Sequence, residues 1–315
     1  MLTGAAWPLL RAHFERSAHG PADRLPRRSN EPCAASNRRR KHRVSRFKVT
    51  ACIAEHIGDR PEQQDRVAIL TSKRNPGALL AIVADGMGGR TGGRMASDQV
   101  IATADSLFQE LSEQDTALPQ LLRQIAAEAH TVIRLTAISS EKEPHSTIVA
   151  LIVKKDYAIW AHAGDSRLYY FRAGRLVHRT DDHTYASMLA AEGKVEAAEV
   201  AATRYKNILV SALGIAREPQ VVVGEANDLR VGDAFLLCSD GLWAYFEDYE
   251  LGSLLHSLSP REASEHLVRI ARDRAKGRGD NLSLAIVKLE APEPKKRLPS
   301  ATLWFEKDSP EPSQA

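Results

Sequence analysis

The chain has 315 residues, of which 43% are hydrophobic and 26% are charged. This balance is typical of a globular protein and excludes a wholly disordered or fibrous chain. No stretch approaches the roughly 20 apolar residues that a membrane-spanning helix needs. The length allows one large domain or two small ones, each able to bury a core.

The formal net charge of +3 is unevenly distributed. Residues 1–46 hold eleven Arg and Lys against three acidic residues, whereas 291–315 hold four of each, which leaves a net charge of −5 for 47–290. We interpret 1–46 as a disordered basic N-terminal extension, 47–290 as the folded domain and 291–315 as a C-terminal tail. Contact of the extension with nucleic acid or another acidic surface stays an alternative. No nucleic-acid binding is expected for the folded domain.

The three cysteines, Cys33, Cys52 and Cys238, are far apart and form no CxxC motif. An odd number without short spacing argues against a disulfide framework and against a cysteine-based zinc site. A reducing compartment fits this pattern, and we expect a cytoplasmic protein. Cys238 follows an apolar run and is expected to be a small core residue.

Strand and helix patterns alternate along the folded domain. Short apolar or alternating runs predict strands at 49–56, 66–72, 78–84, 147–153, 157–162, 167–171, 176–178, 221–225, 234–238 and 282–288. The helical periodicity predicts two long helices before residue 147, with shared faces formed by Ser97, Ile101, Ala104, Phe108 and Leu111 and by Leu118, Leu122, Ile125, Ala129 and Val132.

Two further helices are expected at 248–258 and 260–276, the second with proline at its first position. Residues 184–206 have a less apolar helical pattern and are expected to form a flap-like insertion. Hairpin-like strands grouped with paired helices indicate an α+β fold rather than a doubly wound parallel sheet.

Five aspartates lie at the ends of predicted strands, each beside glycine or a small polar residue, in the segments Gln64-Asp65, Asp85-Gly86, Gly164-Asp165-Ser166, Ser239-Asp240-Gly241 and Gly279-Asp280-Asn281. Carboxylates that converge on one place repel one another unless a cation neutralises them. Oxygen ligands select hard ions, so the pattern favours Mg²⁺ or Mn²⁺ over Zn²⁺. The alternative is that each aspartate is a turn or cap residue, because Asp-Gly is a common turn dipeptide.

Other catalytic patterns are weak or absent. The segment Gly86-Met87-Gly88-Gly89 lacks the third glycine of a dinucleotide fingerprint, since Thr91 stands in its place, and no GK[ST] motif is present. No G-x-S-x-G elbow surrounds Ser166 or Ser239, so a serine nucleophile has little support. His183 is either a catalytic base or ligand or, more simply, a surface-loop residue.

In their order and spacing, these segments resemble the metal-dependent serine/threonine protein phosphatases of type 2C, the PPM family, with a methionine typical of its bacterial branch. The resemblance covers 47–290 and is carried by Arg60-x-x-x-x-Asp65, Val83-Ala84-Asp85-Gly86-Met87-Gly88-Gly89, Ala163-Gly164-Asp165-Ser166-Arg167, Asp182-His183, Asn207-Ile208-Leu209 with Ala212-Leu213-Gly214, Ser239-Asp240-Gly241-Leu242-Trp243 and Gly279-Asp280-Asn281. It implies a four-layer α-β-β-α sandwich of two antiparallel sheets flanked by helix pairs.

The resemblance also implies a metal centre at one edge of the sandwich. Asp85 would bridge two Mn²⁺ or Mg²⁺ ions, and Gly86 would offer its carbonyl oxygen to one of them. Asp240 and Asp280 would complete the carboxylates around the other ion. Asp165, with Asp240, would hold a weaker third ion.

The remaining roles follow from the same resemblance. Asp65 would sit beside the second ion and act through water, while Arg60 would bind the substrate phosphate, for which its planar fork is suited. Arg60, Asp85 and Asp240 are therefore the expected catalytic residues. The implied reaction is hydrolysis of phosphoserine and phosphothreonine by a metal-activated water, without a phospho-enzyme. The implied partners are phosphoproteins and a cognate Ser/Thr kinase, and we expect a monomer.

Two residues depart from the family pattern. Gln64 stands where the family often has Glu, which removes a charge near the second ion, and Met87 stands where eukaryotic relatives often have a His that acts as a general acid. A catalytically weak pseudophosphatase that binds or scaffolds phosphoproteins is therefore the alternative hypothesis. A third hypothesis keeps the chemistry but takes a small phosphorylated metabolite as substrate.

Overall fold

The computed structural model describes residues 47–112, 115, 117–140, 143–192 and 208–292. The predicted N-terminal extension, the tail from residue 293 onward and residues 193–206 of the predicted flap lie outside the described residues. In the described part of the chain, no helix is both long enough and apolar enough to cross a membrane.

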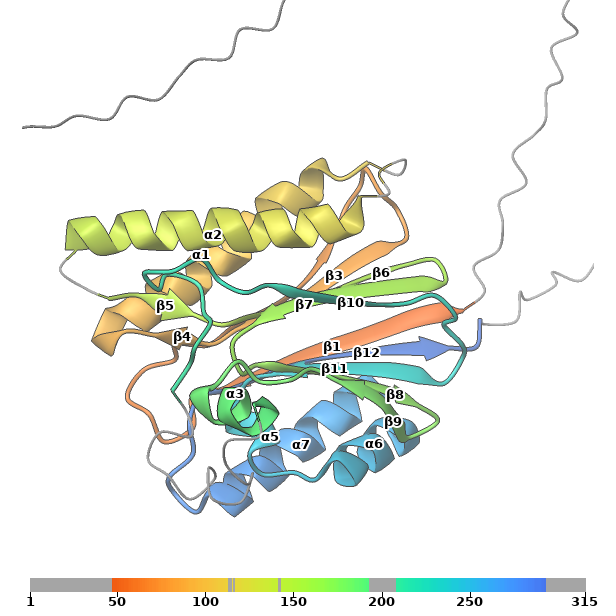
Figure 1. The fold of residues 1–315 in the computed structure, drawn as a ribbon. Coiled ribbons are helices and arrows are strands. Elements are labelled where there is room, and N and C mark those ends of the chain that lie inside the picture. The colour runs from red at the N-terminus through yellow and green to blue at the C-terminus, as the bar shows by residue number, and fades with distance from the viewer. Residues whose placement is uncertain (1–46, 113–114, 116, 141–142, 193–207, 293–315) are drawn as a thin grey trace, which may run out of the picture. The chain divides into compact units, whose positions relative to one another are not determined.

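Two five-stranded sheets lie face to face (Figure 1), and every strand pairing in them is antiparallel. The first sheet has the order β1 (Lys48–His56), β12 (Leu282–Glu290), β11 (Asp233–Cys238), β8 (Arg167–Arg172) and β9 (Arg175–Arg179). The second has the order β10 (Val222–Ala226), β7 (Tyr157–Ala163), β6 (Ile148–Lys154), β3 (Ala78–Ala84) and β2 (Arg66–Thr71). A small separate pair joins β4 (Gly86–Met87) to β5 (His145–Ser146).

Helix pairs cover both outer faces of the sandwich (Figure 1). Helices α1 (Gly89–Glu110) and α2 (Leu118–Ser140) pack on the second sheet, and α6 (Asp248–Ser257) and α7 (Pro260–Ala275) pack on the first. Two short helices, α3 (Tyr185–Ala191) and α5 (Asp240–Trp243), lie near one end of the strands. The predicted α-β-β-α sandwich is confirmed.

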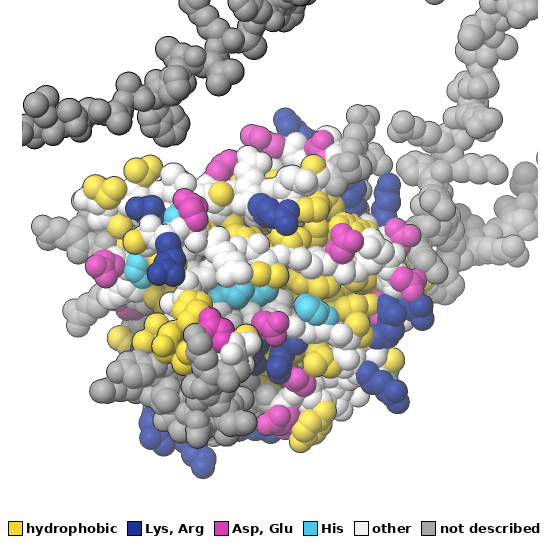
Figure 2. Space-filling model, in the orientation of Figure 1, with side chains coloured by type: hydrophobic (Ala, Val, Ile, Leu, Met, Phe, Trp, Pro, Cys, Tyr) yellow, Lys and Arg dark blue, Asp and Glu magenta, His cyan; other side chains and the backbone are white. Residues whose placement is uncertain are grey.

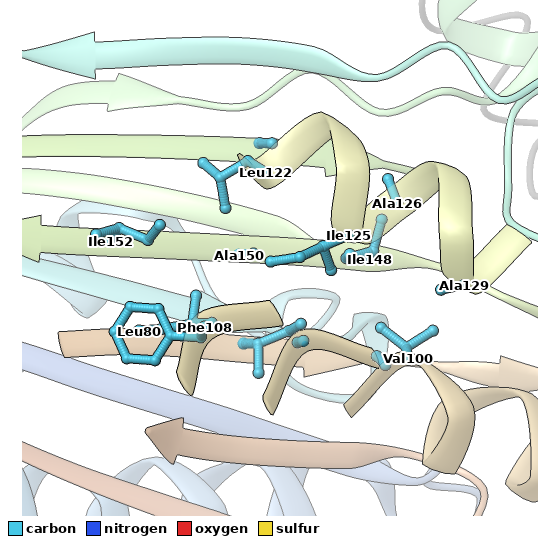
Figure 3. Close-up of a cluster of buried hydrophobic side chains, with 14 of the residues drawn as sticks. Leu80, Val100, Phe108, Leu122, Ile125, Ala126, Ala129, Ile148, Ala150 and Ile152 are labelled. Carbon is cyan, nitrogen blue, oxygen red and sulfur yellow. The ribbon is translucent and has the colours of Figure 1, made fainter. Parts of the chain in front are cut away.

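Three hydrophobic clusters separate the four layers. Because successive side chains of a strand point to opposite faces, β6 contributes to two of these clusters. Ile148, Ala150 and Ile152 pack against the helix pair, and Val149, Leu151 and Val153 pack between the sheets. Figure 3 shows the first of these clusters, in which side chains of α1 and α2 meet those of β3 and β6. Continuous apolar runs are therefore the expected sequence of these central strands.

The helix faces were predicted correctly except at two positions. In α2 the expected core residue Val132 is 37% exposed, and its neighbour Ile133 is buried instead. In α1 Val100 is fully buried, although the pattern assigned the face to Ile101 and its neighbours. One residue advances the helix by about 100°, so a face read from spacing alone can be displaced by one position. Cys238 is fully buried, as expected for a core residue.

The antiparallel registers bring one end of both sheets together. In the second sheet Arg66 at the start of β2 pairs with Ala84 at the end of β3, and Ile148 at the start of β6 pairs with Ala163 at the end of β7. In the first sheet Cys238 at the end of β11 pairs with Arg167 at the start of β8. The strand ends that carry the five aspartates therefore meet at the same edge of the sandwich.

Candidate active site

All five aspartates leave or enter strands at this edge. Asp65 precedes β2 and Asp85 follows β3, while Asp165 lies in the connection from β7 to β8. Asp240 begins α5 just after β11, and Asp280 lies two residues before β12. The two sheets and one connection between them thus contribute to a single cluster of five carboxylates.

The electrostatics place Asp85 at the centre of this group. Burial raises the pKa of Asp85 well above its usual value, and the charges of the other four aspartates raise it further. Burial also raises the pKa of Asp240, with a further contribution from Asp280. The pKa of Asp165 rises to about 7, first through burial and then through the charges of Asp240 and Asp182. Carboxylates that repel one another in this way are neutralised by protons or by a cation.

Asp65 is almost completely buried, at 1% exposure, beneath the centre of the group. The Ser239 hydroxyl donates a hydrogen bond of 2.7 Å to its Oδ2, and the Asp85 side chain forms another. Burial still raises the pKa of Asp65, because these hydrogen bonds only partly offset the loss of solvent. Asp65 is thus held in place by the residues that directly follow β11 and β3.

Arg60 faces the same centre from the loop between β1 and β2. Its Nη2 lies 2.6 Å from Oδ2 of Asp280, and its side chain is 58% exposed. The bond with Asp280 raises the pKa of Arg60, and the charges of Asp240 and Asp85 add to the rise. An exposed guanidinium next to a carboxylate centre can take up an incoming anion.

The loop that carries Arg60 is fixed by two polar residues. The Asn281 side chain accepts a 2.7 Å hydrogen bond from the backbone N–H of Gln64. It also donates to the carbonyl oxygens of Ile57 and Glu62. Asp59 accepts two 2.7 Å hydrogen bonds from Arg272 and one from the Gly279 amide. The turn of Asp280 and the loop of Arg60 are therefore built against each other.

Gly86 and Gln64 pack against the start of α1. A Cβ on Gly86 would lie 2.1 Å from the carbonyl oxygen of Gly93, so only glycine permits this approach. Gln64 Nε2 donates a 2.6 Å hydrogen bond to the carbonyl oxygen of Gly89. A glutamate in this place could not donate that bond, which gives Gln64 a structural role in this chain.

Asp165 is positioned by side chains from two other segments. Trp243 Nε1 donates a 2.9 Å hydrogen bond to the Asp165 carbonyl oxygen, and the Trp243 ring lies 3.4 Å from the Arg167 guanidinium carbon. Arg167 binds both carboxylate oxygens of Asp182 at 2.8 Å. His183 accepts a 3.3 Å hydrogen bond from the Gly164 amide and stacks on His162. His183 therefore supports the Asp165 connection instead of standing alone on a surface loop.

The donor set suits a hard divalent cation. It consists of carboxylates and the backbone carbonyl of Gly86, and oxygen ligands of this kind are those that Mg²⁺ and Mn²⁺ prefer. Among the described residues, no three His, Cys, Asp or Glu side chains already stand in the arrangement of a metal site. In this structure Arg60 is bound to Asp280, and Asp65 is bound to Ser239. The mutual repulsion of the carboxylates is nevertheless the electrostatic condition that a cation relieves.

The sequence predicted a site formed by the aspartates and Arg60, but it did not predict the groups that hydrogen-bond to them. Ser239, Asn281 and Trp243 lay within the quoted motifs, yet nothing in the pattern assigned them a partner. Asp59 and Thr147 carried no signal at all, although the Thr147 hydroxyl accepts a 3.0 Å hydrogen bond from the Asp85 amide. Such contacts join residues far apart in the chain, so spacing does not reveal them.

Comparison with known proteins agrees with this geometry. The family model described as Protein phosphatase 2C matches residues 54–272, which include Arg60 and four of the five aspartates. The chain belongs to the protein phosphatase 2C family. The match covers both sheets except for the first part of β1 and the whole of β12, and Asp280 lies just beyond it.

Several serine/threonine phosphatases are similar to this chain. The serine/threonine protein phosphatase PstP of Mycobacterium tuberculosis is 32% identical over 217 residues, which span 67% of this chain but only 40% of that protein. The solved structure of the Streptococcus agalactiae serine/threonine phosphatase has a TM-score of 0.71 at 26% identity and covers 77% of this chain and 100% of its own. The catalytic domain of PstP in complex with two manganese ions has a TM-score of 0.62 at 27% identity, over 77% of this chain and 98% of that domain.

Proposed function

We propose that this chain hydrolyses phosphoserine and phosphothreonine in proteins in a metal-dependent reaction and so reverses the action of a cognate Ser/Thr kinase. The single observation that carries the proposal is the convergence of five aspartates and Arg60 on one edge of a protein phosphatase 2C sandwich. The related phosphatases, one of them in complex with two manganese ions, support the same activity. In this proposal the protein is a cytoplasmic monomer.

The site residues keep the roles that the resemblance implies. In our proposal Asp85 would hold two Mn²⁺ or Mg²⁺ ions, and the carbonyl oxygen of Gly86 would hold one of them. Asp240 and Asp280 would hold the other ion, and Asp165 with Asp240 would hold a weaker third ion. When bound, such cations supply positive charge for the phosphoryl oxygens and make water more acidic.

The chain's own side chains orient the substrate and the ligands. Arg60 can exchange its bond with Asp280 for the substrate phosphate, because its guanidinium is exposed and its fork fits two phosphate oxygens. The buried Asp65 acts through water and is held by Ser239. Met87 has no proton to give, so the leaving oxygen of serine or threonine takes its proton from water or another group.

Phosphate release from a phosphothreonine peptide tests the proposal. We expect turnover with Mn²⁺ or Mg²⁺ and its complete loss with excess chelator. Asp240→Asn should abolish turnover, whereas Asp273→Asn, which changes an exposed carboxylate on α7, should not. Arg60→Lys should raise KM by roughly tenfold because the two-pronged contact is lost.

The same assay separates the alternatives. A folded protein without turnover in either cation would favour the pseudophosphatase that binds phosphoproteins. Equal kcat/KM on free phosphoserine and on phosphopeptides would favour a small phosphorylated metabolite as substrate. Turnover that survives the chelator would rule out the metal-dependent reaction.

A further inference from the structure

A cavity of about 560 Å³ lies beside the candidate active site and involves none of the residues assigned above to ions or phosphate. Its volume falls within the usual range of ligand pockets. It opens between α3, the segment 179–184 and the start of β8, and its lining includes Arg167, Arg179, Asp181, Asp182, Met188 and Val210. In Figure 2 the surface around α3 carries apolar, acidic and basic side chains next to one another.

The cavity is close to the carboxylate centre. Arg167 lies two residues after Asp165, and Asp182, its bidentate partner, lines the cavity as well. The amide of His183, which also lines the cavity, donates a 2.9 Å hydrogen bond to the carbonyl oxygen of Gly164, next to Asp165. The charge of Asp182 raises the pKa of both Asp165 and Asp240. A peptide whose phosphorylated residue occupies the centre therefore brings its neighbouring side chains to this cavity.

After the ion pairs at the cavity are counted, one carboxylate has no basic partner among the described residues. Arg167 is occupied by Asp182, with two hydrogen bonds of 2.8 Å. Arg179 is occupied by Asp248, with contacts of 3.1 and 2.9 Å. The exposed carboxylate of Asp181 makes no hydrogen bond or ion pair among the described residues. The charge that the cavity still offers a ligand is negative.

The walls of the cavity are in part apolar. Met188, which is 38% exposed, and Ala191 lie on α3, and Val210 lies across from them after the insertion. Long basic side chains pack their methylene stems on such surfaces while the charged head reaches a polar partner. An apolar wall beside a single unpaired carboxylate is the complement of a lysine or arginine side chain.

We propose that this cavity receives a lysine or arginine side chain that flanks the phosphorylated residue of the protein substrate, with its stem on α3 and its cation at Asp181. This proposal rests on the proposed function and names the substrate class of the same site. It makes Asp181 a specificity residue, which acts on the substrate sequence and not on the reacting phosphate.

Phosphothreonine peptides test the preference. In an alanine background, lysine, norleucine or glutamate is placed in turn at each position within three residues of the phosphothreonine, and kcat/KM is measured with Mn²⁺. At one position we expect lysine to exceed norleucine by roughly threefold to fivefold, as an exposed ion pair provides, and glutamate to fall below alanine. Asp181→Asn should bring lysine to the level of norleucine, and Asp181→Lys should favour glutamate.

Two controls make the outcomes distinct. Asp273→Asn removes an exposed carboxylate far along the chain, on α7, and should keep the lysine preference. An aryl phosphate without flanking residues reports on the reaction centre alone. Turnover of the aryl phosphate with no lysine preference, or with a preference that Asp181→Asn retains, would overturn this proposal and leave the phosphatase. No turnover of any substrate by the folded protein would overturn the proposed function and this proposal with it.

Discussion

Ser239 and Asp65 are joined by a buried hydrogen bond of 2.7 Å although 174 residues separate them in the chain. The same Ser239 hydroxyl accepts a 3.0 Å hydrogen bond from the amide of Ser283 on β12. One side chain thus ties the end of β11 to the start of β2 in the other sheet. Because Asp65 is buried beside the carboxylates of Asp85, Asp240 and Asp280, its orientation depends on this donor.

Replacing Ser239 should weaken the affinity for the activating cation. In Ser239→Ala the donor to Asp65 is lost, and groups that orient ligands in this way typically contribute about 10-fold to 100-fold to metal affinity. We expect the Mn²⁺ concentration for half-maximal activity to rise by about that factor, while kcat at saturating Mn²⁺ changes less. Titration of peptide turnover against free Mn²⁺ measures both quantities.

Ser283→Ala is the matched control for this prediction. The Ser283 hydroxyl is buried and has no hydrogen-bond partner, while its amide bond to Ser239 does not need the side chain. This variant should therefore keep the Mn²⁺ requirement of the parent protein. If both variants shift the titration equally, the effect comes from disturbed packing and not from the hydrogen bond to Asp65.

Gln64→Glu should have two opposite effects. The new carboxylate adds negative charge near the cation site, which strengthens cation binding, but it loses the 2.6 Å bond to the Gly89 carbonyl oxygen. We expect the Mn²⁺ concentration for half-maximal activity to fall. We also expect the free energy of unfolding of the metal-free protein to fall by about 1 kcal/mol. Gln64→Met loses the bond without adding charge and should show only the loss of stability in urea denaturation. Unchanged stability of both variants would show that this hydrogen bond does not matter for the fold.

Neighbouring residues on α2 should differ strongly in their contribution to stability. Ile133 is 1% exposed and Val132 is 37% exposed, although the periodicity favoured Val132. We expect Ile133→Ala to lower the free energy of unfolding by about 2–4 kcal/mol, and Val132→Ala to change it by less than about 0.5 kcal/mol. Urea denaturation of both variants checks the order, and similar losses would contradict the packing described here.

The pair between Glu250 and Arg274 should make stability depend on pH. Two hydrogen bonds, of 2.9 and 2.6 Å, join these side chains and lower the pKa of Glu250 from 4.5 to about 2. A group whose pKa is lower in the folded state stabilises the protein at pH values above its pKa in the unfolded state. This stabilisation is lost as the pH falls through the folded-state pKa. Glu250→Gln should therefore cost about 1 kcal/mol at pH 7 and progressively less below pH 4.5. A difference that stays constant down to pH 3 would show that Glu250 does not titrate as described.

Much of the fold follows from local pattern. Buried strands such as β3 are continuous apolar runs, and α7 begins with Ser259, Pro260 and Glu262, which form a capping box with proline at the first position. Each of these signals lies within a few residues, so the sequence reveals it directly. The short pair β4 and β5 was not predicted, because a contact between distant segments defines it. The single turn of α5 was not predicted either, because four residues are too few to show a helical period.

For the candidate site, the sequence allowed a prediction of the aspartates but not of the residues that hold them in place. Aspartates next to glycine at strand ends are visible in the sequence, and antiparallel pairing brings the ends together. Which hydroxyl binds Asp65, and which arginine binds Asp59, depends on register and packing between residues 174 and 213 positions apart, respectively. The cavity beside α3 is likewise absent from any pattern, because its walls come from segments that are far apart in the chain.

The carboxylates of the site are divided between the two layers of the sandwich. Asp65 and Asp85 belong to one sheet, Asp240 and Asp280 to the other, and Asp165 to the connection that crosses between them. A cation held by carboxylates of both sheets links the two layers at one end of the sandwich. Its binding free energy then also adds to the free energy of unfolding. At a free concentration one hundred times its dissociation constant, such a ligand adds about 2.7 kcal/mol to stability. The supply of divalent cation would therefore raise the equilibrium stability of the folded protein as well as its rate of turnover.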